Sequence, residues 1–270
     1  MNLFVNAQRR LRNGWWLLLF FALMAAMLIA LQRVSASPWV QIAIIAAATT
    51  ICQLLRRRPL TEITGRIDAQ WLMQLLTGCA LGAALMLAPA LLLRLIGAVR
   101  WTRSDATLAA IAGAIPMVIA IALAEELLFR GFLFQRLIDG AGALAAQLIV
   151  AAWFVLTHSA ALAHAGSVRW LAAINIFVAS LLFGFAFLRT SRLAMPFGLH
   201  FAANFTQGKL LGFGVSGNHD AGLLVVHRGS SAEWLTGAAF GLEASLPGLV
   251  AVIAVTWLVA RGRPRWIRTS

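Results

Sequence analysis

The sequence predicts an all-α polytopic membrane protein with about eight transmembrane helices. The composition supports this class, because 61% of the 270 residues are hydrophobic and only 11% are charged, whereas soluble domains carry about 25% charged residues. The apolar residues also gather into segments close to the roughly 20 residues that cross a bilayer as a helix. Since the hydrocarbon layer offers no water to backbone polar groups, these segments should be helical.

Eight apolar segments follow one another along the chain. They run approximately over residues 15–33, 38–55, 70–97, 106–129, 143–163, 168–188, 193–213 and 244–260. Val34-Ser35-Ala36 resembles a signal-peptide cleavage site, but the first segment is longer than a usual signal core, so an uncleaved first helix is expected. In the third segment, Gly78-x-x-x-Gly82 predicts close contact with another helix.

The chain is expected to form one structural domain with three parts. Residues 1–105 would supply the first transmembrane helices, and residues 106–262 would form the core that holds the polar motifs. Residues 263–270 would form a basic tail on the cytoplasmic side. No internal repeat separates these parts.

The net charge of +13 comes from arginines at the ends of apolar segments, where they set topology and meet anionic lipid headgroups. Nucleic acid is therefore not an expected partner. With the amino terminus placed in the cytoplasm, fifteen of the 22 basic residues fall on that side. They are Arg9, Arg10, Arg12, Arg56, Arg57, Arg58, Arg66, Arg130, Arg136, Arg189, Arg192, Arg261, Arg263, Arg265 and Arg268. This bias predicts an integral, multi-pass protein with both termini cytoplasmic, and the Arg-rich, Lys-poor composition favours a bacterial inner membrane.

The fourth apolar segment ends in AEELLFRG, which places three ionisable residues within a membrane helix. Glu126 and Arg130 are four residues apart, so they share a helix face and can form an ion pair. Glu125 lies about 100° around the helix from Glu126 and has no cationic partner at helical spacing, which suits a general base. Ionisable residues at this depth indicate function by default.

Two further segments carry polar side chains at helical spacing. His158 follows Phe154 by one turn in FVLTH, and His200 precedes Asn204 by one turn in HFAAN. His158 could hold or relay a proton of a water molecule that Glu125 activates. His200 and Asn204 can donate hydrogen bonds to an oxyanion. These parts together indicate hydrolysis of an amide by activated water.

The three motifs in this order resemble those of the CPBP (Abi) family of intramembrane proteases, relatives of the type II CAAX prenyl endopeptidases. They read E125-E126-L-L-F-R130, F154-V-L-T-H158 and H200-F-A-A-N204, and the resemblance covers roughly residues 110–260. The later stretch LTGAAFGLEAS at 235–245 is also similar to a segment of bacterial members.

The resemblance implies an eight-helix fold around a conical cavity that opens to the cytoplasm and the membrane. It implies Glu125 as the water-activating residue with His158 beside it, and His200 with Asn204 as the oxyanion site. It implies Glu126 and Arg130 as supporting residues. The substrate would be a membrane-associated protein or peptide, and prenylation of that substrate does not carry over.

Two questions stay open at this point. Glu125, His158 and His200 could instead hold a zinc ion, although the His-Glu-x-x-His pattern is absent and a metal-free mechanism is favoured. The alternative function is a non-catalytic membrane scaffold or bacteriocin-immunity protein that uses the same cavity. A transporter with Glu125 and Glu126 as a proton relay is a weaker alternative, because transporters often contain inverted repeats.

Overall fold

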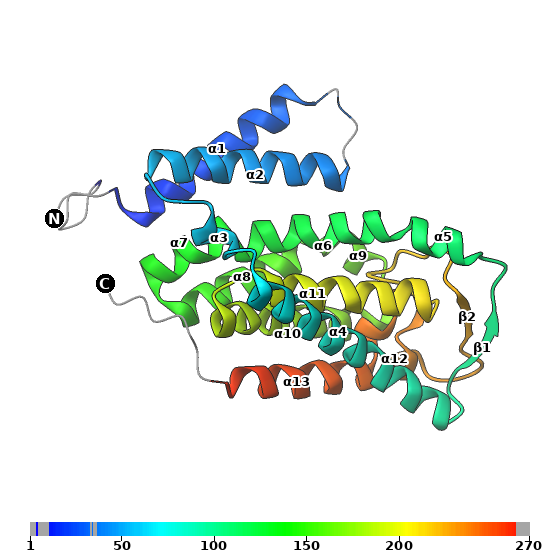
Figure 1. Cartoon of the computed structure of the whole chain (residues 1–270). Coiled ribbons are helices and arrows are strands. Elements are labelled where there is room, and N and C mark those ends of the chain that lie inside the picture. Colours follow the sequence, from blue (N-terminus) through cyan, green and yellow to red (C-terminus); the bar gives the residue numbers. More distant parts are fainter. Residues whose placement is uncertain (1–3, 5–10, 33, 35–36, 263–270) are drawn as a thin grey trace.

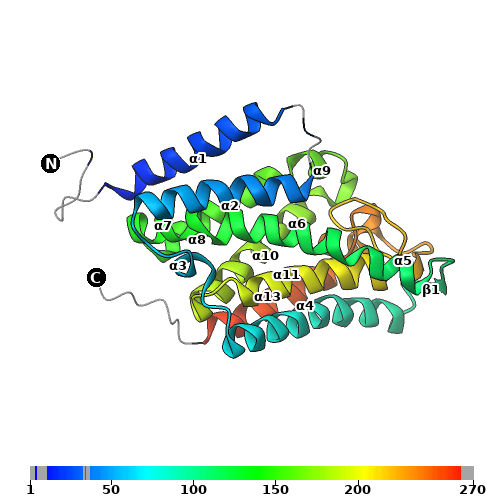
Figure 2. The same cartoon turned by 45° about the horizontal axis from the view of Figure 1, so that its top comes forward.

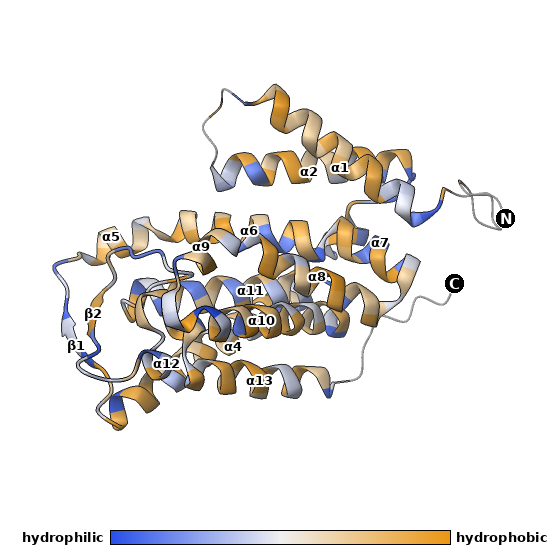
Figure 3. Ribbon diagram, turned by 180° about the vertical axis from the view of Figure 1, so that it is seen from behind, coloured by the Kyte–Doolittle hydropathy of each residue, from blue (hydrophilic) through white to orange (hydrophobic). Residues whose placement is uncertain are grey.

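The computed structural model describes residues 4, 11–32, 34 and 37–262. The predicted basic tail, most of the cleavage-like tripeptide, and Arg9 and Arg10 lie outside these residues. Helices dominate the described part of the chain, as predicted. Figure 3 shows that apolar residues cover most of each long helix, with polar residues gathered in the connections and at helix ends.

Most helices follow the predicted apolar segments, but two helices divide the fourth segment, and residues 132–141, which no predicted segment includes, are also helical. The long helices are α1 (Asn13–Ala30), α2 (Pro38–Leu55), α4 (Ala69–Leu95), α5 (Leu108–Gly113), α6 (Ile115–Arg130), α7 (Phe132–Ala141), α8 (Ala143–Thr157), α10 (Arg169–Thr190), α11 (Ala194–Asn204) and α13 (Leu246–Ala260). Pro38, Pro116 and Pro247 stand in the first turns of α2, α6 and α13, where a missing backbone N–H costs nothing.

Shorter elements connect these helices. They are α3 (Thr61–Thr64), α9 (Ser159–Ala163), α12 (Glu233–Thr236), the 3₁₀ turns η1 (Gly166–Val168), η3 (Ala238–Phe240) and η4 (Leu242–Ala244), and the π-helical segment η2 (Phe205–Leu210). Strands β1 (Arg100–Arg103) and β2 (Leu224–His227) form a small antiparallel sheet, with Arg100 opposite His227. Neither strand was predicted, because each is short and its partner lies far away in sequence.

The fold is that of an all-α polytopic membrane protein, as predicted. Among the residues that the structure describes, five helical stretches are long and apolar enough to cross a membrane: Asn13–Ala30, Pro38–Leu55, Ala69–Leu95, Leu108–Ala141 and Gly166–Thr190. Helices α8 and α13 are also apolar but shorter, with 15 residues each. The exact number of eight crossings therefore stays a prediction.

The long helices lie roughly side by side and share one long axis (Figures 1 and 2). Helices α1 and α2 form a hairpin that covers α6 and α7, while α4, α10, α11 and α13 pack together on the other side of α6. The start of α1 and the end of α13 lie at one end of this bundle, and the β1–β2 sheet lies at the opposite end.

Helices α4 and α11 approach so closely that only glycine fits between their backbones. A Cβ atom added at Gly78 or Gly82 would collide with the carbonyl oxygens of Met195 and Leu199, and one added at Gly198 would collide with that of Leu75. The predicted close contact at Gly78-x-x-x-Gly82 is therefore present, and its partner is the helix that carries His200. This contact fixes the position of α11 in the bundle.

Candidate active site

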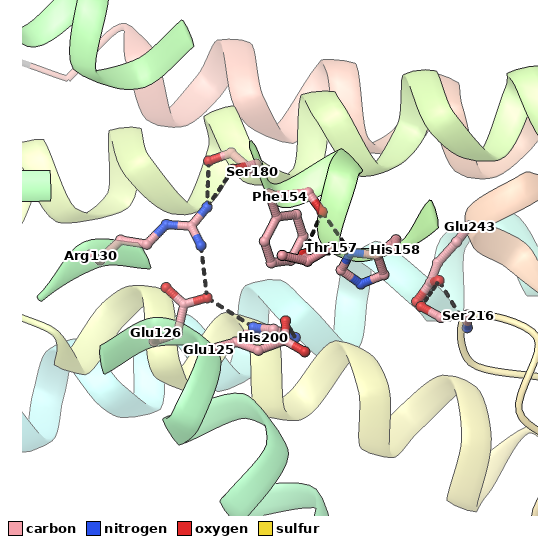
Figure 4. Close-up of polar contacts among 10 residues, drawn as sticks. All are labelled: Glu125, Glu126, Arg130, Phe154, Thr157, His158, Ser180, His200, Ser216 and Glu243. Atoms are coloured by element: carbon pink, nitrogen blue, oxygen red, sulfur yellow. Dashed lines mark hydrogen bonds and ion pairs between the residues drawn. The ribbon is translucent and has the colours of Figure 1, made fainter. Parts of the chain in front are cut away.

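A buried polar network joins three helices at the middle of the bundle (Figure 4). Glu126 Oε1 lies 3.4 Å from Arg130 Nη1 and 2.8 Å from His200 Nδ1. Arg130 Nη2 donates to both the backbone carbonyl and the hydroxyl oxygen of Ser180, each at 2.8 Å. The side chains of Glu126 and Arg130 are fully buried. Since a buried ion needs a partner and further hydrogen bonds, each member of this network depends on the others.

Three phenylalanine rings surround the Arg130 guanidinium. Its carbon lies 5.8, 5.3 and 5.1 Å from the ring centroids of Phe129, Phe154 and Phe183, within the range of cation–π attraction. Phe183 also stacks on His200, with centroids 4.8 Å apart and ring planes 9° from parallel. Phe154 of the second motif therefore helps to hold Arg130 of the first motif in place.

Glu125 has different surroundings from its neighbour Glu126. Its side chain is 29% exposed, lines a cavity, and has Oε2 3.7 Å from His200 Nε2. The reason is the 100° rotation per residue of a helix, which turns Glu126 toward Arg130 and Glu125 toward the cavity. Two adjacent carboxylates thus separate into a buried, paired one and an accessible one.

The imidazole of His200 lies between these two carboxylates. Because a carboxylate accepts hydrogen bonds, the contact at Glu126 requires a proton on Nδ1. Nε2 is thereby turned toward Glu125 and the cavity. Stacking on Phe183 and the hydrogen bond to Glu126 together leave the ring little rotational freedom.

His158 ends α8 and lines the same cavity. Its Nδ1 lies 2.7 Å from the carbonyl oxygen of Phe154. A carbonyl can only accept, so Nδ1 carries the proton and Nε2 of the neutral ring is an acceptor. This tautomer suits a group that receives a proton or orients a water molecule.

Asn204 lies one turn after His200 and also lines the cavity. It is the last residue of α11, immediately before the π-helical segment η2. Such segments occur often at functional sites. The structure thus brings Glu125, His158, His200 and Asn204, which were predicted from three separate motifs, to one cavity of about 1200 Å³.

Two cavity residues were not among the predicted site residues. Glu243, on η4, accepts hydrogen bonds from the backbone N–H of Ser216 at 3.1 Å and from its hydroxyl at 2.9 Å. Desolvation at the cavity wall raises the pKa of Glu243, while the Ser216 hydrogen bonds act in the opposite direction. Glu243 lies in the stretch at 235–245 whose similarity to bacterial relatives was a usable signal.

Asn175, on α10, is the second such residue. Its side chain is buried at the cavity wall, and Nδ2 has no hydrogen-bond partner. Unpaired buried donors are rare in proteins, so this amide is available to a ligand. A polar residue inside the apolar segment 168–188 was the signal that could have found it.

The residues do not fit a bound zinc ion in this arrangement. Within the described part of the chain, no three His, Cys, Asp or Glu side chains gather as metal ligands would. His158 and His200 both direct Nδ1 to protein acceptors, as histidine ligands of zinc also do, so it is the separation of the candidate ligands that disfavours zinc.

Residues 106–206 match the family model described as Type II CAAX prenyl endopeptidase Rce1-like. The matched region contains all three motifs, so it confirms the resemblance that these motifs indicated. It suggests a CAAX-type endopeptidase that acts within a membrane on a peptide or protein. The comparison with curated proteins gave no match.

Proposed function

We propose that this chain, a relative of the type II CAAX prenyl endopeptidases, hydrolyses a peptide bond of a membrane-associated protein or peptide without a metal ion. One observation carries the proposal. Glu126 is buried and bonded to Arg130 and His200, whereas the adjacent Glu125 is 29% exposed and faces the cavity. Glu125 can therefore act as a base in the cavity, while Glu126 holds His200 and Arg130 in position.

In the proposed reaction, Glu125 removes a proton from water while the water oxygen forms a bond to the scissile carbonyl carbon. His158, whose Nε2 is an acceptor, orients this water. The carbonyl oxygen becomes an oxyanion that accepts hydrogen bonds from Asn204 and from Nε2 of a doubly protonated His200. Donors of this kind each accelerate hydrolysis by on the order of 10²–10³.

The tetrahedral intermediate then collapses, and the bond from carbon to nitrogen breaks. The proton held by Glu125 moves to the departing amine, which gives a carboxylic acid and an amine. The remaining proton of the acid then passes to the amine, so the products leave as a carboxylate and an ammonium ion. Glu126 takes no part in proton transfer. It acts on His200 Nδ1 and keeps the ring oriented, while Arg130 balances its charge.

The test compares peptide termini in membranes of cells that carry the wild-type protein or a Glu125 variant. Both Glu125→Gln and Glu125→Ala are expressed at matched levels and checked for a single symmetric peak in gel filtration. New termini that occur only with the wild type would establish proteolysis and would identify candidate substrates.

Identical termini in the presence of folded wild-type and variant proteins would contradict the proposal. The function would then be non-catalytic, and a scaffold role would replace it. A phenotype of the wild type that survives Glu125→Gln would lead to the same conclusion.

A further inference from the structure

We propose that the cavity is entered from the non-cytoplasmic face of the membrane, so that the substrate is an exported polypeptide held by an apolar membrane segment. The nature of the substrate rests on the proposed function, whereas the direction of entry does not. Three observations carry the proposal: where the cavity opens, where the arginines lie, and which residues form its apolar wall.

The cavity is closed toward the end of the bundle where α1 begins and α13 ends. On that side of Glu125 lie the buried Glu126–Arg130 pair and the surrounding phenylalanines. Among the described residues, none from the connections at that end, 56–68, 131–142 and 189–193, lines the cavity. Water and substrate therefore do not enter from this side.

The cavity opens toward the other end of the bundle, where α9 and the long connection between η2 and α13 lie (Figures 1 and 2). Polar residues in or next to these segments line it there: His164, Lys209, Ser216, Asn218, Asp220 and Glu233. Asn218 and Asp220 are exposed. In Figure 4, His158, Glu243 and Ser216 follow one another in this direction, away from Arg130.

The arginines are distributed unequally between the two ends. The described basic residues at the closed end are Arg12, Arg56, Arg57, Arg58, Arg66, Arg136, Arg189, Arg192 and Arg261. Those at the open end are Arg94, Arg100, Arg103, Arg169, Lys209 and Arg228. Short connections rich in Lys and Arg stay in the cytoplasm, so the closed end is cytoplasmic.

This arrangement separates two expectations that the sequence allowed together. The resemblance implied a cavity open to the cytoplasm, and the arginines implied cytoplasmic termini. Because the cavity opens at the end opposite the start of α1 and the end of α13, both cannot hold. The charge bias is a property of this chain itself, and it favours entry from the other face.

The apolar wall of the cavity indicates the form of the substrate. Met24 and Leu28 of α1, Ile44 of α2, and Val118 and Ile121 of α6 line it. Only 6% of the α1 span is buried in the protein, so this wall borders the lipid. An apolar segment of a membrane protein can lie along it while the peptide beyond its outer end meets Glu125.

The test measures the accessibility of single cysteines and needs no substrate. In a background with Cys52→Ala and Cys79→Ala, Asn218→Cys marks the cavity mouth, Ala239→Cys marks its wall, and Thr61→Cys marks the closed end. All three positions are exposed. Spheroplasts are treated with a membrane-impermeant maleimide before and after permeabilisation.

We expect Asn218→Cys and Ala239→Cys to react in intact spheroplasts and Thr61→Cys to react only after permeabilisation. The reverse pattern would overturn the proposal, as would equal reaction of Thr61→Cys and Asn218→Cys in intact spheroplasts. If the cysteine-free background does not fold, a carboxyl-terminal fusion to a fluorescent protein or an alkaline phosphatase replaces it. Fluorescence without phosphatase activity is expected, and the opposite result would refute the orientation.

The same labelling on Glu125→Gln separates this inference from the proposed function. Suppose that the variant is labelled like the wild type and that the peptide termini in membranes are the same for both. The orientation would then stand, and the protease proposal would fail. If instead new peptide termini show that substrates are cut in their cytoplasmic connections, the protease proposal stands and the proposed direction of entry fails.

Discussion

His200 and Glu126 form a buried hydrogen bond of 2.8 Å between Nδ1 and Oε1. The bond joins α11 to α6 across 74 positions of the chain, and it turns the other ring nitrogen of His200 toward Glu125 and the cavity. Glu126 therefore has two partners, since it also pairs with Arg130. Substitution of the two adjacent glutamates should therefore affect the stability of the fold differently.

Glu126→Gln is expected to destabilise the fold, whereas Glu125→Gln is not. Removing one partner of a buried ion pair leaves Arg130 uncompensated, which costs about 3–5 kcal/mol. Glu125 is 29% exposed and its Oε2 lies 3.7 Å from His200 Nε2. The Glu125→Gln variant should therefore unfold at a temperature close to that of the wild type. Thermal unfolding of both variants in the same detergent measures the difference, and equal midpoints would contradict the described network.

Gly82→Ala is expected to abolish activity and lower stability. The added methyl group would collide with the backbone of α11 at Leu199, so the helix that carries His200 and Asn204 must move. Gly113→Ala is the matched control, because an added Cβ there meets no atom within 4 Å and alanine favours a helix over glycine by about 1 kcal/mol. A Gly82→Ala protein with wild-type stability and cleavage would show that the close contact is dispensable.

Asp68 is expected to make stability depend on pH in acid. Its hydrogen bond with Arg192, followed by that from the Trp71 N–H, lowers the pKa of Asp68 below its ordinary value of 3.8. The contact is thus fully stabilising above that ordinary pKa and is lost as the pH falls through the lowered one. It joins the start of α4 to the turn before α11.

The measurement compares unfolding midpoints of wild type and Asp68→Asn from neutral pH down to about pH 3. Asparagine can still accept from the Trp71 N–H, so only the charge is lost. The wild type should unfold at higher temperature near neutral pH, and the difference should shrink below about pH 4. A difference that stays constant over this range, or that grows in acid, would contradict the assignment.

Glu243→Ala is expected to weaken catalysis, and Glu243→Gln is expected to restore part of it. Glu243 accepts both the N–H and the hydroxyl of Ser216, and so fixes one wall of the cavity beside His158. Glutamine keeps an acceptor for these donors, whereas alanine keeps none. Steady-state cleavage of a substrate identified from membrane termini should show a raised KM for the alanine variant. Equal loss in both variants would mean that the charge of Glu243 matters more than its hydrogen bonds.

Local patterns in the sequence were sufficient for the helices and for one contact of the site. Continuous apolar segments of bilayer length can only satisfy their backbones as helices, which is why the predicted segments and the observed helices agree. The pair of Glu126 and Arg130 follows from a spacing of four on one helix. The strands β1 and β2 escaped prediction because Arg100 and His227 meet only through the tertiary fold.

By itself, therefore, the sequence determined a helical membrane protein and the residue types of its site. The tertiary structure alone decided which groups meet: His200 with Glu126, Arg130 with Ser180, and Glu243 with Ser216. These contacts cross 74, 50 and 27 positions, so they depend on how helices and connections are placed against one another. The periodicity of one helix fixes a face, but only the contact between helices fixes what that face meets.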